Sequence, residues 1–184
     1  MSISTIAARV AGVSLAAPLL LGSGVALAQV SPGSFPGAVN PAFAPGSSHL
    51  TSGTIGCLVS SNLDVSCSSY VLGGVGHTNA TVDLNADYSA TIDCTNGGGN
   101  LVESHTTTTS NSSSASVAST KNGQLSVPSQ MVTNPILSAP QTCPNPNWTP
   151  SIRGGSATLN CFTYTLTFQG RSSPAVDIAS GTCP

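Results

Sequence analysis

ATVDLNADYSATIDC, residues 80–94, alternates apolar and polar side chains without a break. Successive side chains of a β-strand point to opposite faces, so this pattern puts every apolar residue on one face and the hydroxyls, amides and carboxylates on the other. A helix would scatter the same residues around its circumference, and the β-branched and tyrosine content also favours a strand. The stretch therefore predicts a long, half-buried β-strand.

Several other stretches show strand-like alternation between turn signals. We expect further strands over residues 54–60, 63–71, 101–109, 116–120, 124–127, 157–169 and 175–179. Asn122-Gly123 predicts a two-residue hairpin turn, and no segment of ten residues after residue 28 shows helical spacing. The fold class expected is all-β, a disulfide-stapled antiparallel β-sandwich that is immunoglobulin-like in the broad sense. A small β-barrel is the alternative.

The first 28 residues have the order of a secretory signal peptide. One cation, Arg9, precedes an apolar run, and Ala26-Leu27-Ala28 supplies a small-residue cleavage motif before Gln29. We therefore expect an exported chain, with no transmembrane segment after cleavage. Residues 29–53 are rich in Pro and Gly and predict an arm that Phe35 and Phe43 could dock, and residues 54–184 predict a single β domain.

All of the cysteines follow the predicted cleavage site, and an even number in an exported chain predicts disulfides. The six are Cys57, Cys67, Cys94, Cys143, Cys161 and Cys183. They form no CxxC motif and no histidine lies among them at ligand spacing, so we expect no zinc site.

The pairing of these cysteines depends on the strand register. A hairpin about the glycine loop 73–79 would put Cys57 opposite Cys94, which makes this pair a candidate, conditional on that register. Cys161 and Cys183 flank a predicted hairpin and form a second candidate pair. The remaining two cysteines are then partners by elimination.

Charge is sparse throughout the chain. Only 5% of residues are charged, and the formal net charge is −2. A phosphate-binding surface needs clustered Lys and Arg, so we expect no nucleic-acid partner. A surface kept in water by Ser, Thr, Asn and Gly suits a protein that works beside a wall, an extracellular polymer or another surface protein. An extracellular domain with a merely neutral surface is an equal alternative.

Trp148 and His77 are the two candidate binding residues. A tryptophan in CPNPNWT could stack on a sugar or bind a partner, because large rigid rings supply contact area cheaply. We prefer to place it at one end of the core, beside Cys143. His77 lies in the glycine loop near Asp83 and is the best candidate base, although an exposed loop histidine usually has no chemical role.

Known catalytic and metal-binding patterns are incomplete in this chain. Asp83-x-Asn85-x-Asp87 has the opening spacing of a calcium loop, but Tyr88 stands where that loop needs its turning glycine, so we prefer a solvated strand face. No serine lies in a G-x-S-x-G elbow, and the Asp residues at 83, 87 and 93 share one strand face. We therefore expect no catalytic residue, metal or cofactor.

Two motifs carry a resemblance to known proteins. Residues 73–100 combine a glycine-rich turn, the long strand and CTNGGGN, and residues 143–148 read CPNPNW. This combination resembles a largely uncharacterised group of small exported Cys-containing β proteins of mycolic-acid bacteria, other actinobacteria and filamentous fungi. The likeness covers about residues 67–168, and Gly-Val-Gly-His at 74–77 departs from the commoner leucine-and-asparagine turn. It implies export and a β domain, and no activity.

These observations predict a secreted, non-enzymatic protein of the cell surface or extracellular space, with a structural or adhesive role. The first alternative is a secreted module that binds a glycan, a lipid or a partner protein. A small secreted hydrolase is the weaker alternative.

Overall fold

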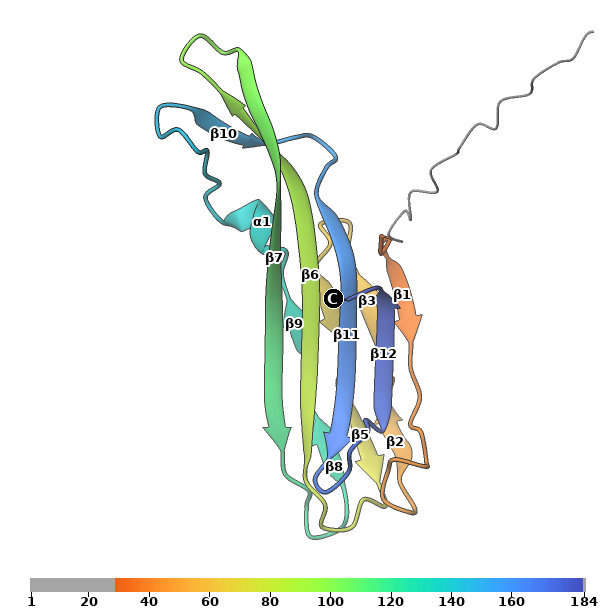
Figure 1. Ribbon diagram of the computed structural model, residues 1–184. Helices are drawn as coiled ribbons and strands as arrows, with labels where there is room; N and C mark the ends of the chain where they lie inside the picture. The colour runs from red at the N-terminus through yellow and green to blue at the C-terminus, as the bar shows by residue number, and fades with distance from the viewer. Residues whose placement is uncertain (1–28, 184) are drawn as a thin grey trace, which may run out of the picture.

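The computed structural model describes residues 29–183, and these residues are almost entirely β-structure (Figure 1). The signal peptide predicted for residues 1–28 lies outside the described residues. The elements are β1 (Gly33–Pro36), β2 (His49–Gly53), β3 (Gly56–Val59), β4 (Val65–Cys67), β5 (Tyr70–Gly73), β6 (Ala80–Thr95), β7 (Leu101–Val117), β8 (Leu125–Val127), β9 (Gln130–Val132), α1 (Pro135–Ser138), β10 (Thr149–Ile152), β11 (Thr158–Phe168) and β12 (Val176–Gly181). The predicted all-β class is confirmed.

One layer is a five-stranded antiparallel sheet, which we call the long sheet. Its body has the order β7, β6, β11 and β12, and β10 pairs with β6 beyond the end of β11. β6 and β7 have 16 and 17 residues and run past the body to form a protruding arm at the end where β10 lies (Figure 1). The arm therefore consists of the distal parts of β6 and β7, the turn between them, and β10.

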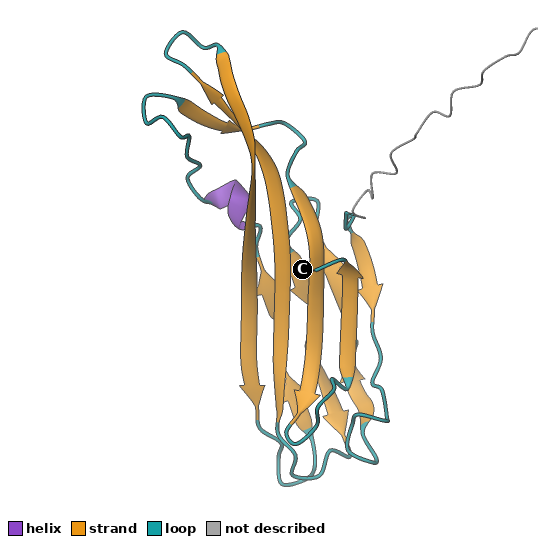
Figure 2. Ribbon diagram, in the orientation of Figure 1, coloured by secondary structure: helices purple, strands orange, loops and turns teal. Residues whose placement is uncertain are grey.

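The second layer consists of two shorter antiparallel sheets. One has the order β1, β3, β4, β9 and the other the order β2, β5, β8. Both lie over the same face of the long sheet, so the strands form two open layers rather than a closed barrel (Figure 2). This arrangement is consistent with the predicted disulfide-rich sandwich.

The alternation in residues 80–94 is realised residue by residue. Val82, Leu84 and Tyr88 of β6 are fully buried, whereas Asn85 between them is exposed. The inward side chains of β6 meet those of β11 and of the shorter sheets in one apolar cluster. Burying large apolar side chains between two layers is the main force that holds such a sandwich together.

The Pro- and Gly-rich residues 29–53 are part of the sandwich instead of lying as a separate arm. β1 pairs with β3, and β2 pairs with β5. The Phe35 ring packs edge-on against Phe162 of β11, with 5.0 Å between ring centroids. Phe43, the other predicted docking residue, is 38% exposed. A pattern that lacks a sustained period predicts neither of these two edge strands.

All six cysteines form disulfides, but two of the three predicted pairings are wrong. Cys161 pairs with Cys183 as expected. Cys57 pairs with Cys67, and Cys94 pairs with Cys143. The expected Cys57–Cys94 bridge required β3 to lie beside β6. β3 instead lies in the other layer between β1 and β4, where Cys57 and Cys67 are direct register partners.

Helix is almost absent from residues 29–183. α1 spans four residues, begins at a proline and is capped by the Asn134 side chain, which accepts a hydrogen bond from the Ile136 N–H at 3.1 Å. No helix in this part of the chain is long and apolar enough to cross a membrane.

Candidate functional site

The outward face of the long sheet carries an array of short polar side chains, which we call the hydroxyl face. Every second residue of its strands points away from the core, and the sequence places Ser, Thr, Asn or Asp at these positions. Its members are Thr81, Asp83, Asn85, Asp87, Ser89 and Thr91 of β6, Thr106, Thr108, Ser110, Ser112, Ser114 and Ser116 of β7, and Thr163, Thr165 and Thr167 of β11.

A shallow groove of about 590 Å³ crosses the hydroxyl face, and we call it the face groove. Its walls include Asp87 of β6, Thr108 and Ser110 of β7, Asn160 of β11 and Thr182 near the C-terminus. The register of β6 against β11 shifts between Leu159 and Cys161, which displaces Asn160 from a regular pairing position. The groove is thus formed by three strands and the C-terminal segment.

The Cys161–Cys183 disulfide holds the C-terminal segment beside the face groove. The Asp87 carboxylate lies 3.4 Å from the Cys161 sulfur atom, in a trio with Cys183. Both sulfur atoms are in the disulfide, so neither carries a thiol proton or a thiolate for a metal. Asp87 is consequently left with oxygen atoms that accept hydrogen bonds from outside the chain.

Hydrogen bonds fix the orientation of the polar groups next to the face groove. The Ser89 hydroxyl donates to the Asn160 side-chain oxygen at 2.8 Å and lies 2.9 Å from the Thr158 hydroxyl. Hydroxyls both donate and accept, and the asparagine amide adds two donors. Threonine methyl groups supply apolar surface between them. This combination suits a ligand with many hydroxyl groups on a partly apolar ring.

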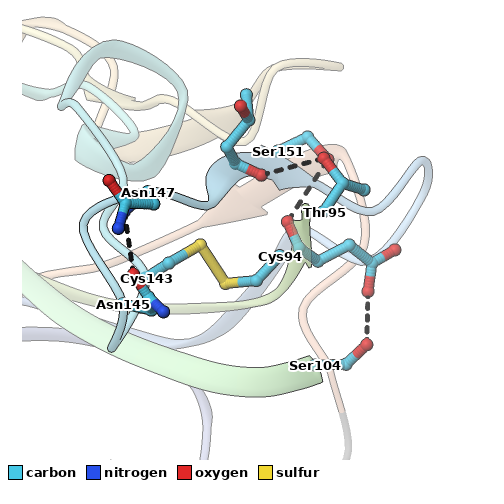
Figure 3. Close-up of a disulfide and its surroundings, with 9 residues drawn as sticks. Cys94, Thr95, Ser104, Cys143, Asn145, Asn147 and Ser151 are labelled. Carbon is cyan, nitrogen blue, oxygen red and sulfur yellow. Dashed lines mark hydrogen bonds between the residues drawn. A yellow bond between two sulfur atoms is a disulfide. The ribbon is translucent and has the colours of Figure 1, made fainter. Parts of the chain in front are cut away.

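Trp148 lies on the arm rather than in the main core. Register pairing of Thr149 with Thr95 places it beside the turn between β6 and β7, and the Cys94–Cys143 disulfide ties its segment to β6 (Figure 3). Trp148 is partly buried and lines a hollow of about 270 Å³ with Cys143 and neighbouring prolines. Its position beside Cys143 matches the preferred interpretation, but it is not a member of the core cluster.

A bidentate ion pair braces the arm. Arg153 donates to the Asp93 carboxylate from Nη2 at 2.7 Å and from Nε at 3.1 Å. The Ser104 hydroxyl of β7 donates to the same carboxylate at 2.6 Å. These hydrogen bonds from Arg153 and Ser104 lower the pKa of Asp93, and Asp93 in turn raises the pKa of Arg153. All charge in this cluster is satisfied internally, so we assign it a structural role.

His77 lies at the end of the molecule opposite the arm. It is exposed in the loop between β5 and β6, whereas Trp148 is next to β10 at the other end (Figure 1). The two predicted binding residues therefore belong to no common site. The Asp83 carboxylate accepts a hydrogen bond from the Ser114 hydroxyl at 2.6 Å and stands on a regular strand, as the solvated-face interpretation expects.

The histidines make few polar contacts in residues 29–183. Nδ1 of His49 lies 2.9 Å from the backbone oxygen of Ser47, and Nδ1 of His105 is buried without a partner. No histidine in this described part hydrogen-bonds a serine hydroxyl or a carboxylate. The hydrolase alternative therefore gains no support from these contacts.

Sequence reasoning missed the face groove entirely. The alternation in residues 80–94 and the hydroxyl run in residues 106–116 were both visible. They become one surface only because β7 pairs with β6 along its whole length and β11 pairs on the other side.

Comparisons with known proteins identify no relative: no protein-family model matches the chain, and neither do any curated proteins or solved structures. The resemblance to small exported proteins of actinobacteria and fungi therefore stays a prediction.

Proposed function

We propose that this chain is a secreted, non-enzymatic protein that attaches to a polyhydroxylated extracellular polymer, such as a cell-wall polysaccharide, through its hydroxyl face. The observation that carries the proposal is the face groove, which lies on an uncovered sheet face and is lined by Asp87, Asn160 and the β7 hydroxyls. Such groups can exchange hydrogen bonds with water for hydrogen bonds with sugar hydroxyls.

The shape of the site favours a polymer over a small metabolite. The groove is open and shallow, and among its walls no Trp, Phe or His side chain supplies a stacking platform. Each contact with a sugar unit is therefore weak, and useful affinity requires many units bound together. An extended chain lying along the long sheet meets this requirement, because hydroxyl-bearing positions continue from Thr106 to Ser116.

Two further observations support export. The three disulfides are compatible with an oxidising compartment, and the first 28 residues have the features of a signal peptide. Sparse charge also suits a protein that packs close to a neutral polymer.

The test is a binding assay with a matched pair of charge substitutions. Thr108→Lys places a bulky cation in the face groove, whereas Ser126→Lys places the same group at an exposed strand position of β8 in the other layer. Purified protein is incubated with insoluble cellulose, chitin and cell-wall sacculi, and the bound fraction is measured after sedimentation. We expect wild type and Ser126→Lys to bind at least one polymer and Thr108→Lys to lose that binding. Equal binding by both variants would place the contact elsewhere.

The hollow beside Trp148 supports a second candidate, a ligand-binding module centred on the arm. Trp148 is the only tryptophan, so its fluorescence reports on the arm alone. Soluble oligosaccharide fragments that bind there should shift the emission, and Trp148→Phe should weaken their binding. Binding in the face groove should leave the emission unchanged, which separates the two candidates.

A further inference from the structure

The outer edge of β7 is the longest unpaired strand edge in residues 29–183. β7 pairs with β6 on one side, and no backbone hydrogen bond joins its other side to any described residue. Unpaired N–H and C=O groups along a strand are a template for another strand. The consequences of this edge do not depend on the proposed polymer binding.

The direction of the free backbone groups follows from two contacts. The Thr91 carbonyl of β6 accepts from Arg153, so odd-numbered residues of β6 point away from β7 and even-numbered ones point toward it. These even residues pair with odd residues of β7, for example Leu84 with Ser113. The Ser112 N–H, free of this ladder, donates to the side chain of Asn111 at 2.9 Å. Even-numbered residues of β7 therefore point their N–H and C=O groups to the open edge.

Every other edge strand carries a feature that discourages pairing. β1 ends at Pro36, the register of β2 shifts between Leu50 and Ser52, and β10 contains Pro150. β8 and β9 have three residues each, and β12 has six. Short strands, prolines and irregular registers are the usual protection of sheet edges. β7 has none of these from residue 103 onward, since its only register shift lies before Glu103.

The composition of β7 makes this edge self-complementary. Glu103 is its only formally charged residue, and Ser or Thr occupies every even position from 104 to 116. An antiparallel pair of β7 strands centred on Ser110 places Ser104 opposite Ser116 and Thr106 opposite Ser114, so small hydroxyls face small hydroxyls. Glu103 of one copy faces Val117 of the other, so no acid meets an acid.

We propose that two copies of this chain associate through β7, as antiparallel neighbours across a twofold axis at Ser110, to form one continuous sheet. The even positions 104–116 supply the hydrogen-bonded pairs, and this length spans about 40 Å at ~3.4 Å per residue. Isologous pairing of this kind closes after two copies because each chain has a single such edge. It also brings the two face grooves side by side, since Thr108 and Ser110 line each of them.

The first test removes one outward N–H without touching the internal ladder. Ser110→Pro deletes a donor on the open edge, whereas Ala179→Pro deletes an outward donor on β12, the opposite edge of the long sheet. Mass is measured by size-exclusion chromatography with light scattering on the disulfide-bonded protein, and circular dichroism checks folding. We expect dimers for wild type and Ala179→Pro and monomers for Ser110→Pro. A monomeric wild type at millimolar concentration, or a dimeric folded Ser110→Pro, would overturn the proposal.

A charge-swap pair keeps the proposal falsifiable if the proline variant fails to fold. Ser110 faces its own copy across the axis, so Ser110→Lys and Ser110→Asp each place like charges together, and we expect each to dimerise about tenfold more weakly at low salt. Mixing the two variants should restore a dimer that contains one of each. Dimers of both single variants with unchanged affinity would refute the register. Loss of polymer binding by Thr108→Lys is measured separately, so either proposal can fail alone.

Discussion

All three tyrosines of the chain are buried, and this makes its response to alkali a sharp test of the packing. They are Tyr70, Tyr88 and Tyr164. Burial raises the pKa of Tyr88 to about 12, and the charge of Asp64 adds to this effect. Burial also raises the pKa values of Tyr70 and Tyr164, whose hydroxyls lie 3.3 Å apart.

The sign and size of the effect follow from proton linkage. An unfolded tyrosine loses its proton near pH 10.0, whereas folded Tyr88 keeps its proton until about pH 12. Between these values the native state binds more protons, so stability is complete below pH 10.0 and falls as pH rises toward 12. The Tyr88 difference alone corresponds to about 3 kcal/mol, and the other two tyrosines increase the loss. We therefore expect cooperative alkaline unfolding before any tyrosine ionises in the native state.

The assay is a tyrosinate absorbance titration, with circular dichroism recorded on the same samples. Absorbance should stay flat through pH 10.0, the ordinary tyrosine value, and then rise together with loss of the β signal. Protein in guanidinium should titrate at the ordinary value. Ionisation of any tyrosine near that value with an intact β signal would contradict the buried positions.

Two conservative variants resolve the individual hydroxyls. The Tyr88 hydroxyl is buried without a hydrogen-bond partner, so Tyr88→Phe should leave stability at neutral pH unchanged or raise it by about 1 kcal/mol, and should reduce the alkaline loss. Tyr70→Phe removes the partner of the Tyr164 hydroxyl and should cost about 1 to 2 kcal/mol. The reverse order of stabilities in urea denaturation would refute this assignment.

Three further predictions concern the arm and the groove wall. The double substitution Cys94→Ala with Cys143→Ala should cost about 4 kcal/mol in urea denaturation, since the bridge closes a long loop with 49 residues of separation. Arg153→Ala should return the lowered pKa of Asp93 toward its ordinary value in a carboxyl NMR titration, and should reduce the stability that wild type loses as pH falls through the native Asp93 pKa. Gly181→Ala should cost about 2 kcal/mol in thermal unfolding, because φ is +78° and a Cβ would collide with the backbone of β11.

Each of these predictions has a control. The Cys57–Cys67 bridge spans a separation of only 10 residues, so its removal should cost about 3 kcal/mol, less than removal of the arm bridge. Gly155→Ala tests the same backbone strain at φ +71° with open space around it and should cost less than Gly181→Ala. An equal cost for the two glycines would mean that the close approach to β11 is unimportant. An unchanged Asp93 pKa in Arg153→Ala would show that the ion pair does not form in solution.

The fold class was predictable because local alternation reports burial directly. In β6 each apolar residue faces a layer of core, so a period of two is sufficient to identify the strand. Residues 33–36 and 49–53 lack that signal, since they are edge strands whose side chains are mostly exposed or only partly buried. Their place in the sheets depends on pairing with β3 and β5, which no local pattern encodes.

The disulfides and the site required knowledge of which strands are neighbours. Cys161 and Cys183 flank a local hairpin, and that pairing was predicted correctly. Cys94 bonds to Cys143, 49 residues away, because the segment after α1 passes back to β6, and sequence spacing carries no record of that path. The face groove has the same origin, since its walls come from three strands and the C-terminal segment.

β6 runs without interruption from the sandwich body to the tip of the arm, and this has a mechanical consequence. A pull applied to the tip along the strand axis loads the backbone hydrogen bonds to β7 and β11 together, in shear. A pull across the sheet would instead peel these bonds one after another, at lower force. The Cys94–Cys143 bond also transfers part of an axial load from the tip to the second layer through α1 and β9. A molecule tethered by its arm and held along its sheet would therefore resist tension best along its own length.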